Sequence, residues 1–155
     1  MNHQPEIILV PVDGSEGASD AARYAAGLAE GLGIPLRLLY AFPKDPVDMF
    51  GVPTEAPRPE ELEYFSPDAF ARLRDQSAEK AFAATREVLG STDVEVQEQI
   101  IGGSPAEAIV EHAATEEAPM IVIGRRGLSG FKELLLGSVS QRVLHHAACP
   151  VTVVR

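Results

Sequence analysis

Three glycines and a serine stand close together in the last third of the chain, at Gly124, Gly127, Gly137 and Ser138. They follow an apolar run at 120–123 and lead into a stretch with helical character that begins at Ser138. A helix start offers unpaired backbone N–H groups and the positive end of the helix dipole, so it attracts anions. Glycine lets a ligand approach the backbone closely and allows positive φ. We therefore predict that this segment binds the phosphates of a nucleotide.

The charges near these glycines differ from those of the whole chain, whose 155 residues carry a formal net charge of −10. Seven acidic residues and no Lys or Arg lie between 91 and 118, whereas Arg125, Arg126, Lys132 and Arg142 follow with only Glu133 against them. A basic loop in an acidic chain fits a small polyanionic ligand, although cations that merely solvate a surface loop would look the same. The overall charge argues against nucleic acid and anionic membranes as partners.

Apolar runs and helical patterns alternate along the chain. We expect strands at 6–12, 35–42, 94–101, 119–123 and 150–154, and helices at 18–32, 67–89, 104–117 and 138–147. This alternation predicts one α/β domain over 1–155, with a parallel sheet and helices on both of its faces. The segment 43–67 holds six of the twelve prolines, and we expect an irregular insert there, with a structured lid as the alternative.

Local signals also predict the helix starts. The residues Ser104 to Glu107 match a capping box, and Ser138 is the expected N-cap of the last helix. The cap of the first helix is either Asp13 or Ser15. Ligands of such sheets bind beyond the carboxyl ends of the strands, where the strand order reverses. Asp13, Ala41 and Gly124 all follow or end strands, so we expect them to meet in one crevice.

The spacing Gly124-x2-Gly127-x9-Gly137-Ser138 resembles the nucleotide-binding signature of the universal stress protein family, in its ATP-binding branch. The segments 11–15, 103–105, 135–139 and 149–151 resemble further parts of that family, so the resemblance covers nearly the whole chain, with 43–67 matched least. It implies a flavodoxin-like or Rossmann-like five-stranded sheet in the order 3-2-1-4-5. It also implies a homodimer formed by antiparallel pairing of the last strand, Val151 to Val154, whose valines would leave an apolar edge.

The resemblance further implies a role for each matching residue. Asp13 would bind the ribose hydroxyls or take part in a metal-linked contact, while Val12 and Ala41 would flank the adenine. The glycines would approach the ribose and phosphates, and Arg126 would counter phosphate charge. Ser138 would combine the N-cap of the last helix with a phosphate contact, and Val139 and Ser140 would add N–H or hydroxyl donors. The predicted set is Pro11, Val12, Asp13, Ala41, Ile123, Gly124, Arg126, Gly127, Gly137, Ser138, Val139 and Ser140. The structural alternatives are a helix cap for Asp13, sheet core for Val12 and Ala41, and turns for the glycines.

These expectations favour an ATP-binding regulatory or stress-response protein, with ADP or AMP as other ligands and Mg²⁺ as an open question. An ATP-hydrolysing or phosphotransfer enzyme is the alternative, but no general base is evident near the glycine loop and no P-loop motif is present. A dimeric scaffold without ligand is the second alternative. The single cysteine, the absence of a signal peptide and the lack of a long apolar run predict a cytoplasmic protein without membrane insertion.

Overall fold

The computed structural model describes residues 4–51, 59–127 and 136–155, which form one five-stranded sheet flanked by helices. The strands are β1 (Ile7–Pro11), β2 (Leu36–Phe42), β3 (Val96–Gly102), β4 (Pro119–Gly124) and β5 (Val151–Val154). All neighbouring strands pair in parallel, in the order β3-β2-β1-β4-β5. The predicted α/β class and strand order are therefore confirmed. The predicted charges at Lys132 and Glu133 lie outside the described residues.

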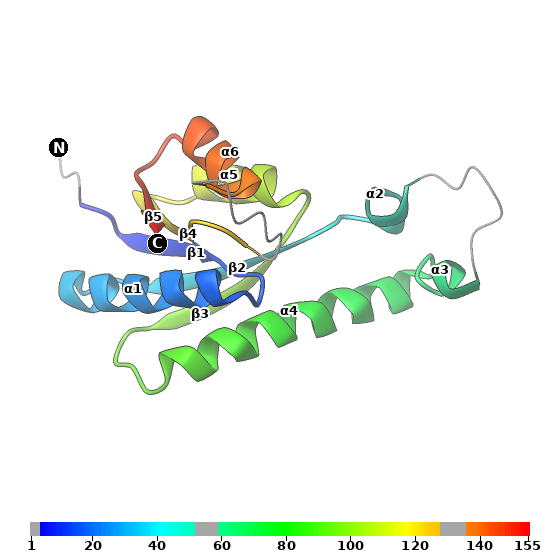
Figure 1. The fold of residues 1–155 in the computed structure, drawn as a ribbon, viewed down its shortest axis with the longest axis horizontal. Helices are drawn as coiled ribbons and strands as arrows, with labels where there is room; N and C mark the ends of the chain where they lie inside the picture. Colours follow the sequence, from blue (N-terminus) through cyan, green and yellow to red (C-terminus); the bar gives the residue numbers. More distant parts are fainter. Residues whose placement is uncertain (1–3, 52–58, 128–135) are drawn as a thin grey trace.

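Helices cover both faces of the sheet, as predicted (Figure 1). The helices α1 (Glu16–Leu32) and α4 (Pro67–Leu89) pack on one face, and α5 (Pro105–Thr115) and α6 (Ser138–His146) pack on the other. The central position of β1 explains why its sequence is a continuous apolar run. Ile8 and Val10 belong to the core on the α1 and α4 side, and Ile7 and Leu9 belong to the core on the α5 and α6 side. A strand buried on both faces needs apolar residues at every position.

The helix α1 lies close to the sheet because its buried face consists largely of alanines. Ala21, Ala22 and Ala25 are completely buried. The helix begins at Ser15, whose Oγ accepts a hydrogen bond from the Ala18 N–H at 3.2 Å. Of the two predicted candidates for the cap, Ser15 is therefore the one that caps the helix. The Asp13 carboxylate instead accepts a hydrogen bond from the Ser15 N–H.

The segment 43–67 is more regular than its proline content predicted. It contains two short helices, α2 (Pro46–Phe50) and α3 (Pro59–Glu63), while its central residues 52–58 lie outside the described part of the chain. The prediction of an irregular insert was wrong for these helices, because proline is favoured at the first position of a helix. Asp45 completes the start of α2 by accepting a hydrogen bond from the Asp48 N–H at 2.8 Å. Both helices project beyond the carboxyl end of β2, alongside the start of α4 (Figure 1).

Two predicted helix starts need correction. Ser104 precedes α5 but makes no side-chain cap hydrogen bond, so the predicted capping box does not form. Both Ser104 and Glu107 are exposed, and the first turn of α5 is closed by the Ala108 N–H, which donates to the Ser104 carbonyl at 2.9 Å. The N-cap of α6 is Gly137, and Ser138 is the first helical residue rather than the cap.

Candidate functional site

A cavity of about 310 Å³ opens at the carboxyl ends of β1, β2 and β4. Its volume lies at the lower end of the range of roughly 300–1,000 Å³ typical of ligand pockets. The twelve residues that the sequence singled out all line it. The structure therefore brings the predicted set together, and their contact with a ligand stays a prediction. The sequence missed six more lining residues: Ser15, Ala18, Leu39, Tyr40, Pro105 and Ile109.

The missed residues follow from the sheet register rather than from a sequence signal. Pro11 of β1 lies beside Leu39 of β2, and the Val12 N–H donates to the Leu39 carbonyl at 2.8 Å. Residues 39–41 therefore reach the same level as the end of β1. On its other side β1 pairs with β4, so β1 is the point at which the strand order reverses. Crevices at such points are the usual ligand sites of parallel sheets.

Two of the signature glycines, Gly124 and Gly127, are required for close packing and not for an unusual backbone conformation, whereas a Cβ on Gly137 would make only ordinary contacts. None of Gly124, Gly127 and Gly137 has positive φ, which corrects part of the reason for singling them out. A Cβ on Gly124 would lie 2.7 Å from the Gly17 carbonyl oxygen, and a Cβ on Gly17 would lie 2.6 Å from the Arg126 carbonyl oxygen. These two glycines therefore let the first turn of α1 touch the end of β4 and the residues after it.

Gly127 has a different neighbour, the carboxylate of Asp13. A Cβ on Gly127 would collide with Asp13 Oδ2. The other carboxylate oxygen, Oδ1, accepts a hydrogen bond from the Ser15 N–H at 2.9 Å. Asp13 therefore contacts both the start of α1 and the glycine loop. Its carboxylate can occupy this place at the cavity wall because Gly127 has no Cβ.

Ser140 holds the loop from within the protein. Its side chain is buried, and its Oγ donates to the Gly124 carbonyl at 2.7 Å and lies 3.2 Å from the Arg125 carbonyl. The Gly137 N–H donates to the same Arg125 carbonyl at 2.7 Å. The Ser140 hydroxyl proton is therefore engaged by the protein, whereas Ser138 is exposed at the start of α6. These hydrogen bonds hold the end of β4 and Arg125 against the first turn of α6.

The wall formed by β2 is mainly apolar. Leu39 and Ala41 belong to or pack against the core under α5, and Ile109 of α5 completes this part of the wall. Tyr40 adds a phenol whose pKa is raised by burial and, to a smaller extent, by the negative charge of Asp13; a hydrogen bond from Ser77 opposes these effects. The Tyr40 phenol is therefore neutral at physiological pH, and Asp13 is the one carboxylate among the described residues that line the cavity.

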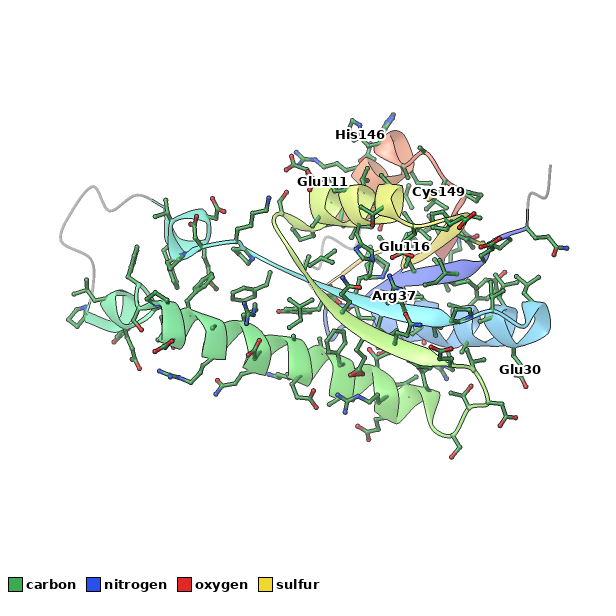
Figure 2. All side chains as sticks on the ribbon, turned by 180° about the vertical axis from the view of Figure 1, so that it is seen from behind. Glu30, Arg37, Glu111, Glu116, His146 and Cys149 are labelled. Carbon is green, nitrogen blue, oxygen red and sulfur yellow. The ribbon has the colours of Figure 1, made fainter. Side chains whose placement is uncertain are left out.

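A second polar cluster lies at the opposite end of the sheet. Arg37 of β2 forms an ion pair with Glu116, the residue that follows α5, and its Nε donates to Gln97 at 2.8 Å (Figure 2). The Arg37 Nη1 lies 3.1 Å from His112 Nε2. Arginine can only donate, so His112 accepts through an unprotonated Nε2. Burial lowers the pKa of His112, and Arg37 lowers it further against the opposing effect of Glu116.

No group of three or more His, Cys, Asp or Glu side chains within 4–51, 59–127 and 136–155 could hold a metal ion. Across the same ranges, no helix is long and apolar enough to cross a membrane.

Comparison with known proteins identifies the family. A family model described as the universal stress protein family matches residues 5–155. The chain belongs to the universal stress protein family. A relative from Thermus aquaticus, also a universal stress protein, is 38% identical over 149 residues, which cover 96% of this chain and 97% of the relative.

Solved structures agree with this family membership. The universal stress protein UspA from Lactobacillus plantarum superposes with a TM-score of 0.75 at 25% identity, covering 99% of this chain and 100% of that one. A universal stress protein solved in complex with cAMP has a TM-score of 0.58 at 24% identity, with 97% of both chains covered. At this level of identity the second structure establishes the shared fold.

Proposed function

We propose that this universal stress protein binds an adenine nucleotide in the cavity at the end of β1, with ATP as the preferred ligand. The observation that carries the proposal is the chemistry of the cavity wall. Val12 and Ala41 contribute apolar lining, and the glycine loop contributes bare backbone. Asp13 follows Val12 in the chain, and its carboxylate lies next to Gly127. A base, a ribose and a phosphate chain require these three kinds of surface.

The proposed roles follow from these positions. The base packs beside Val12 and Ala41, and the ribose hydroxyls donate to the Asp13 carboxylate. The phosphates lie against Gly127, Gly137 and the N–H groups at the start of α6, where the helix dipole favours negative charge. Pro11 and Ile123 complete the wall around the base and ribose. Val139 and Ser140 supply backbone N–H groups.

Arg126 supplies the positive charge of the proposed phosphate site. It is partly exposed, lines the cavity and forms no ion pair with any residue in the described part of the chain. A guanidinium in this position can move toward a phosphate without first breaking a salt bridge.

A relative supports the ligand class. The universal stress protein in complex with cAMP shows that a protein of this fold and family holds an adenine nucleotide. Its 24% identity limits the comparison to the fold, so the choice of ATP for this chain rests on its own glycine loop and helix start.

We propose that the protein senses the nucleotide and hydrolyses it slowly at most. Rapid phosphoryl transfer needs a group that orients the nucleophile, usually together with Mg²⁺. Among the described residues that line the cavity, Asp13 is the only carboxylate, and one of its oxygens already accepts from Ser15. We expect any Mg²⁺ to be held chiefly by the phosphates, with Asp13 as the nearest protein ligand.

We also propose that the protein is a cytoplasmic homodimer paired through β5. This strand is the last in the sheet and has β4 on one side only. The carbonyls of Pro150 and Val154 accept hydrogen bonds from β4 and the residue after it, so those of Val151 and Val153 point to the outer edge. An antiparallel copy of the strand would satisfy these groups and cover the edge. The single cysteine, which has no internal disulfide partner, fits a reducing compartment.

The binding proposal is tested by thermal melting with and without nucleotide. ATP at 100 times its dissociation constant should stabilise the protein by about 2.7 kcal/mol. For a domain of this size that corresponds to a rise in Tm of roughly 5–11 °C. Inorganic triphosphate at the same concentration is the control for the contribution of the base and ribose. If neither ATP nor AMP raises the Tm, the proposal fails; steady-state phosphate release well above background would instead favour the enzyme.

A further inference from the structure

A second cavity, of about 700 Å³, lies at the base of α2. The end of β2, the start of α4 and the end of β3 form its walls, and it shares no lining residue with the first cavity. Its volume is also within the range of roughly 300–1,000 Å³ expected of ligand pockets. The proposed nucleotide function does not use it.

Aromatic rings form the apolar wall of this second cavity. Phe42 of β2 and Phe70 of α4 are buried, with ring centroids 5.3 Å apart and planes tilted by 52°. Phe65, in the turn before α4, lines the cavity as well, and its ring contacts that of Phe50 at 6.1 Å. Phe65 is half-buried and offers an accessible ring, and the buried rings of Phe42 and Phe70 extend the apolar lining beside it, so a flat apolar group can pack here.

Two cations distinguish this wall from an ordinary apolar hollow. Lys44 and Arg74 both line the cavity, whereas the chain as a whole has a net charge of −10. Asp45 is the only acid among the described lining residues, and its carboxylate is bound to the Asp48 N–H at the start of α2. Arg74 pairs with the neighbouring Asp75, but their side chains are 43% and 62% exposed, so solvent weakens this ion pair.

The side chain of Lys44 is held in place by the glycines that end β3. Its stem lies over them, since a Cβ on Gly102 would be 3.3 Å from Lys44 Cγ and a Cβ on Gly103 would be 3.6 Å from Lys44 Cε. Lys44 makes no ion pair with any residue in the described ranges. Its ammonium group therefore carries a charge at the cavity that no described carboxylate neutralises.

We propose that this cavity is a second ligand site, for a small amphipathic anion with an aromatic body and one carboxylate. The ring packs against Phe42, Phe65 and Phe70, and the carboxylate pairs with Lys44 and Arg74. The site adjoins the first cavity along β2, because Tyr40 lines the first and its ring lies 6.4 Å from that of Phe42. Occupation of the second site requires no nucleotide.

The test measures displacement of a fluorescent aromatic anion, 1-anilinonaphthalene-8-sulfonate, from the 155-residue chain without nucleotide. We expect saturable binding of the probe and competition by 4-phenylbutyrate, with about tenfold weaker competition by the uncharged 4-phenylbutanol. Ala71→Trp fills the cavity from α4 and should lower the affinity for the probe by at least about tenfold. Its control is Ala83→Trp, on an exposed position of the same helix.

A second pair of variants tests the charge separately from the space. Lys44→Met keeps an apolar stem over Gly102 but removes the ammonium group. It should lower the affinity for 4-phenylbutyrate several-fold and leave the affinity for 4-phenylbutanol unchanged. Lys80→Met, on the exposed side of α4, is the control and should change neither. Equal binding in Ala71→Trp and Ala83→Trp, or in Lys44→Met and Lys80→Met, would overturn the proposal. A failure here leaves the ATP melting test unaffected, because the two cavities share no lining residue.

Discussion

Substitution of Gly124, at the end of β4, and of Gly127, three residues later, should give different phenotypes, because each faces a different kind of atom. Alanine at 124 would place its Cβ 2.7 Å from the Gly17 carbonyl oxygen, 2.9 Å from its carbonyl carbon and 3.3 Å from the Ala18 nitrogen. Backbone atoms of α1 cannot move without shifting the helix. Alanine at 127 would meet Asp13 Oδ2, the end of a side chain that can rotate.

The structure also sets the size of each effect. For Gly124→Ala we expect the usual cost of overpacking, about 1–3 kcal/mol of unfolding free energy. In a domain of this size that lowers the Tm by roughly 2–12 °C. For Gly127→Ala the carboxylate of Asp13 turns away from the new Cβ, and water replaces its hydrogen bond from Ser15. The ribose hydroxyls of ATP then lose their proposed acceptor, a charged bond of about 1.5–3 kcal/mol, so ATP affinity should fall by roughly 10- to 150-fold.

Circular dichroism melts and isothermal titration calorimetry with ATP separate the two outcomes. Gly27→Ala is the matched control, since a Cβ there has no atom within 4 Å. We expect this variant to melt no lower than wild type and to bind ATP normally. A wild-type Tm for Gly124→Ala would refute the packing explanation. Equal losses of Tm in Gly124→Ala and Gly127→Ala would show that the Asp13 carboxylate cannot move independently of the fold.

Ser140→Ala should cost about 1–3 kcal/mol of stability by leaving the buried Gly124 carbonyl without its donor. Ser138→Ala removes an exposed hydroxyl that lines the cavity at the proposed phosphate site, so it should lower ATP affinity in calorimetry without changing the melt. The pKa of His112 is lowered in the folded protein, whereas in the unfolded chain it is about 6.5. Near and below pH 6.5 the unfolded chain therefore binds more protons at this residue than the folded protein does. Stability should therefore fall as the pH drops through that value, and His112→Gln should flatten the slope in pH-dependent melts while exposed His145→Gln should not. Val153→Pro removes an outward N–H from the edge of β5 and should halve the mass in sedimentation velocity; a wild-type monomer at micromolar concentration would contradict the proposed dimer.

Much of the fold was predictable because its signals are local. The apolar run of β1 indicates burial on both faces, and the alternation of Val94, Val96 and Ile100 with polar residues indicates a half-exposed strand. The structure places these segments at the centre and at one edge of the sheet. The parallel arrangement follows from the helices between the strands. The helices α2 and α3 were missed because their prolines, which suggested irregular chain, occupy helix starts.

The sequence by itself determined the order of elements, the carboxyl-end location of the predicted residues and the family resemblance through the glycine spacing. Only the tertiary structure decided what each residue contacts. It shows Gly124 packed against Gly17, Gly127 against Asp13, and the Ser140 hydroxyl bound to the Gly124 carbonyl. These partners lie far apart in the chain or on different elements, and their distances depend on how α1 and α6 pack on the sheet. Periodicity and capping signals report only on nearby residues, so the glycine loop could be located from sequence but its packing could not.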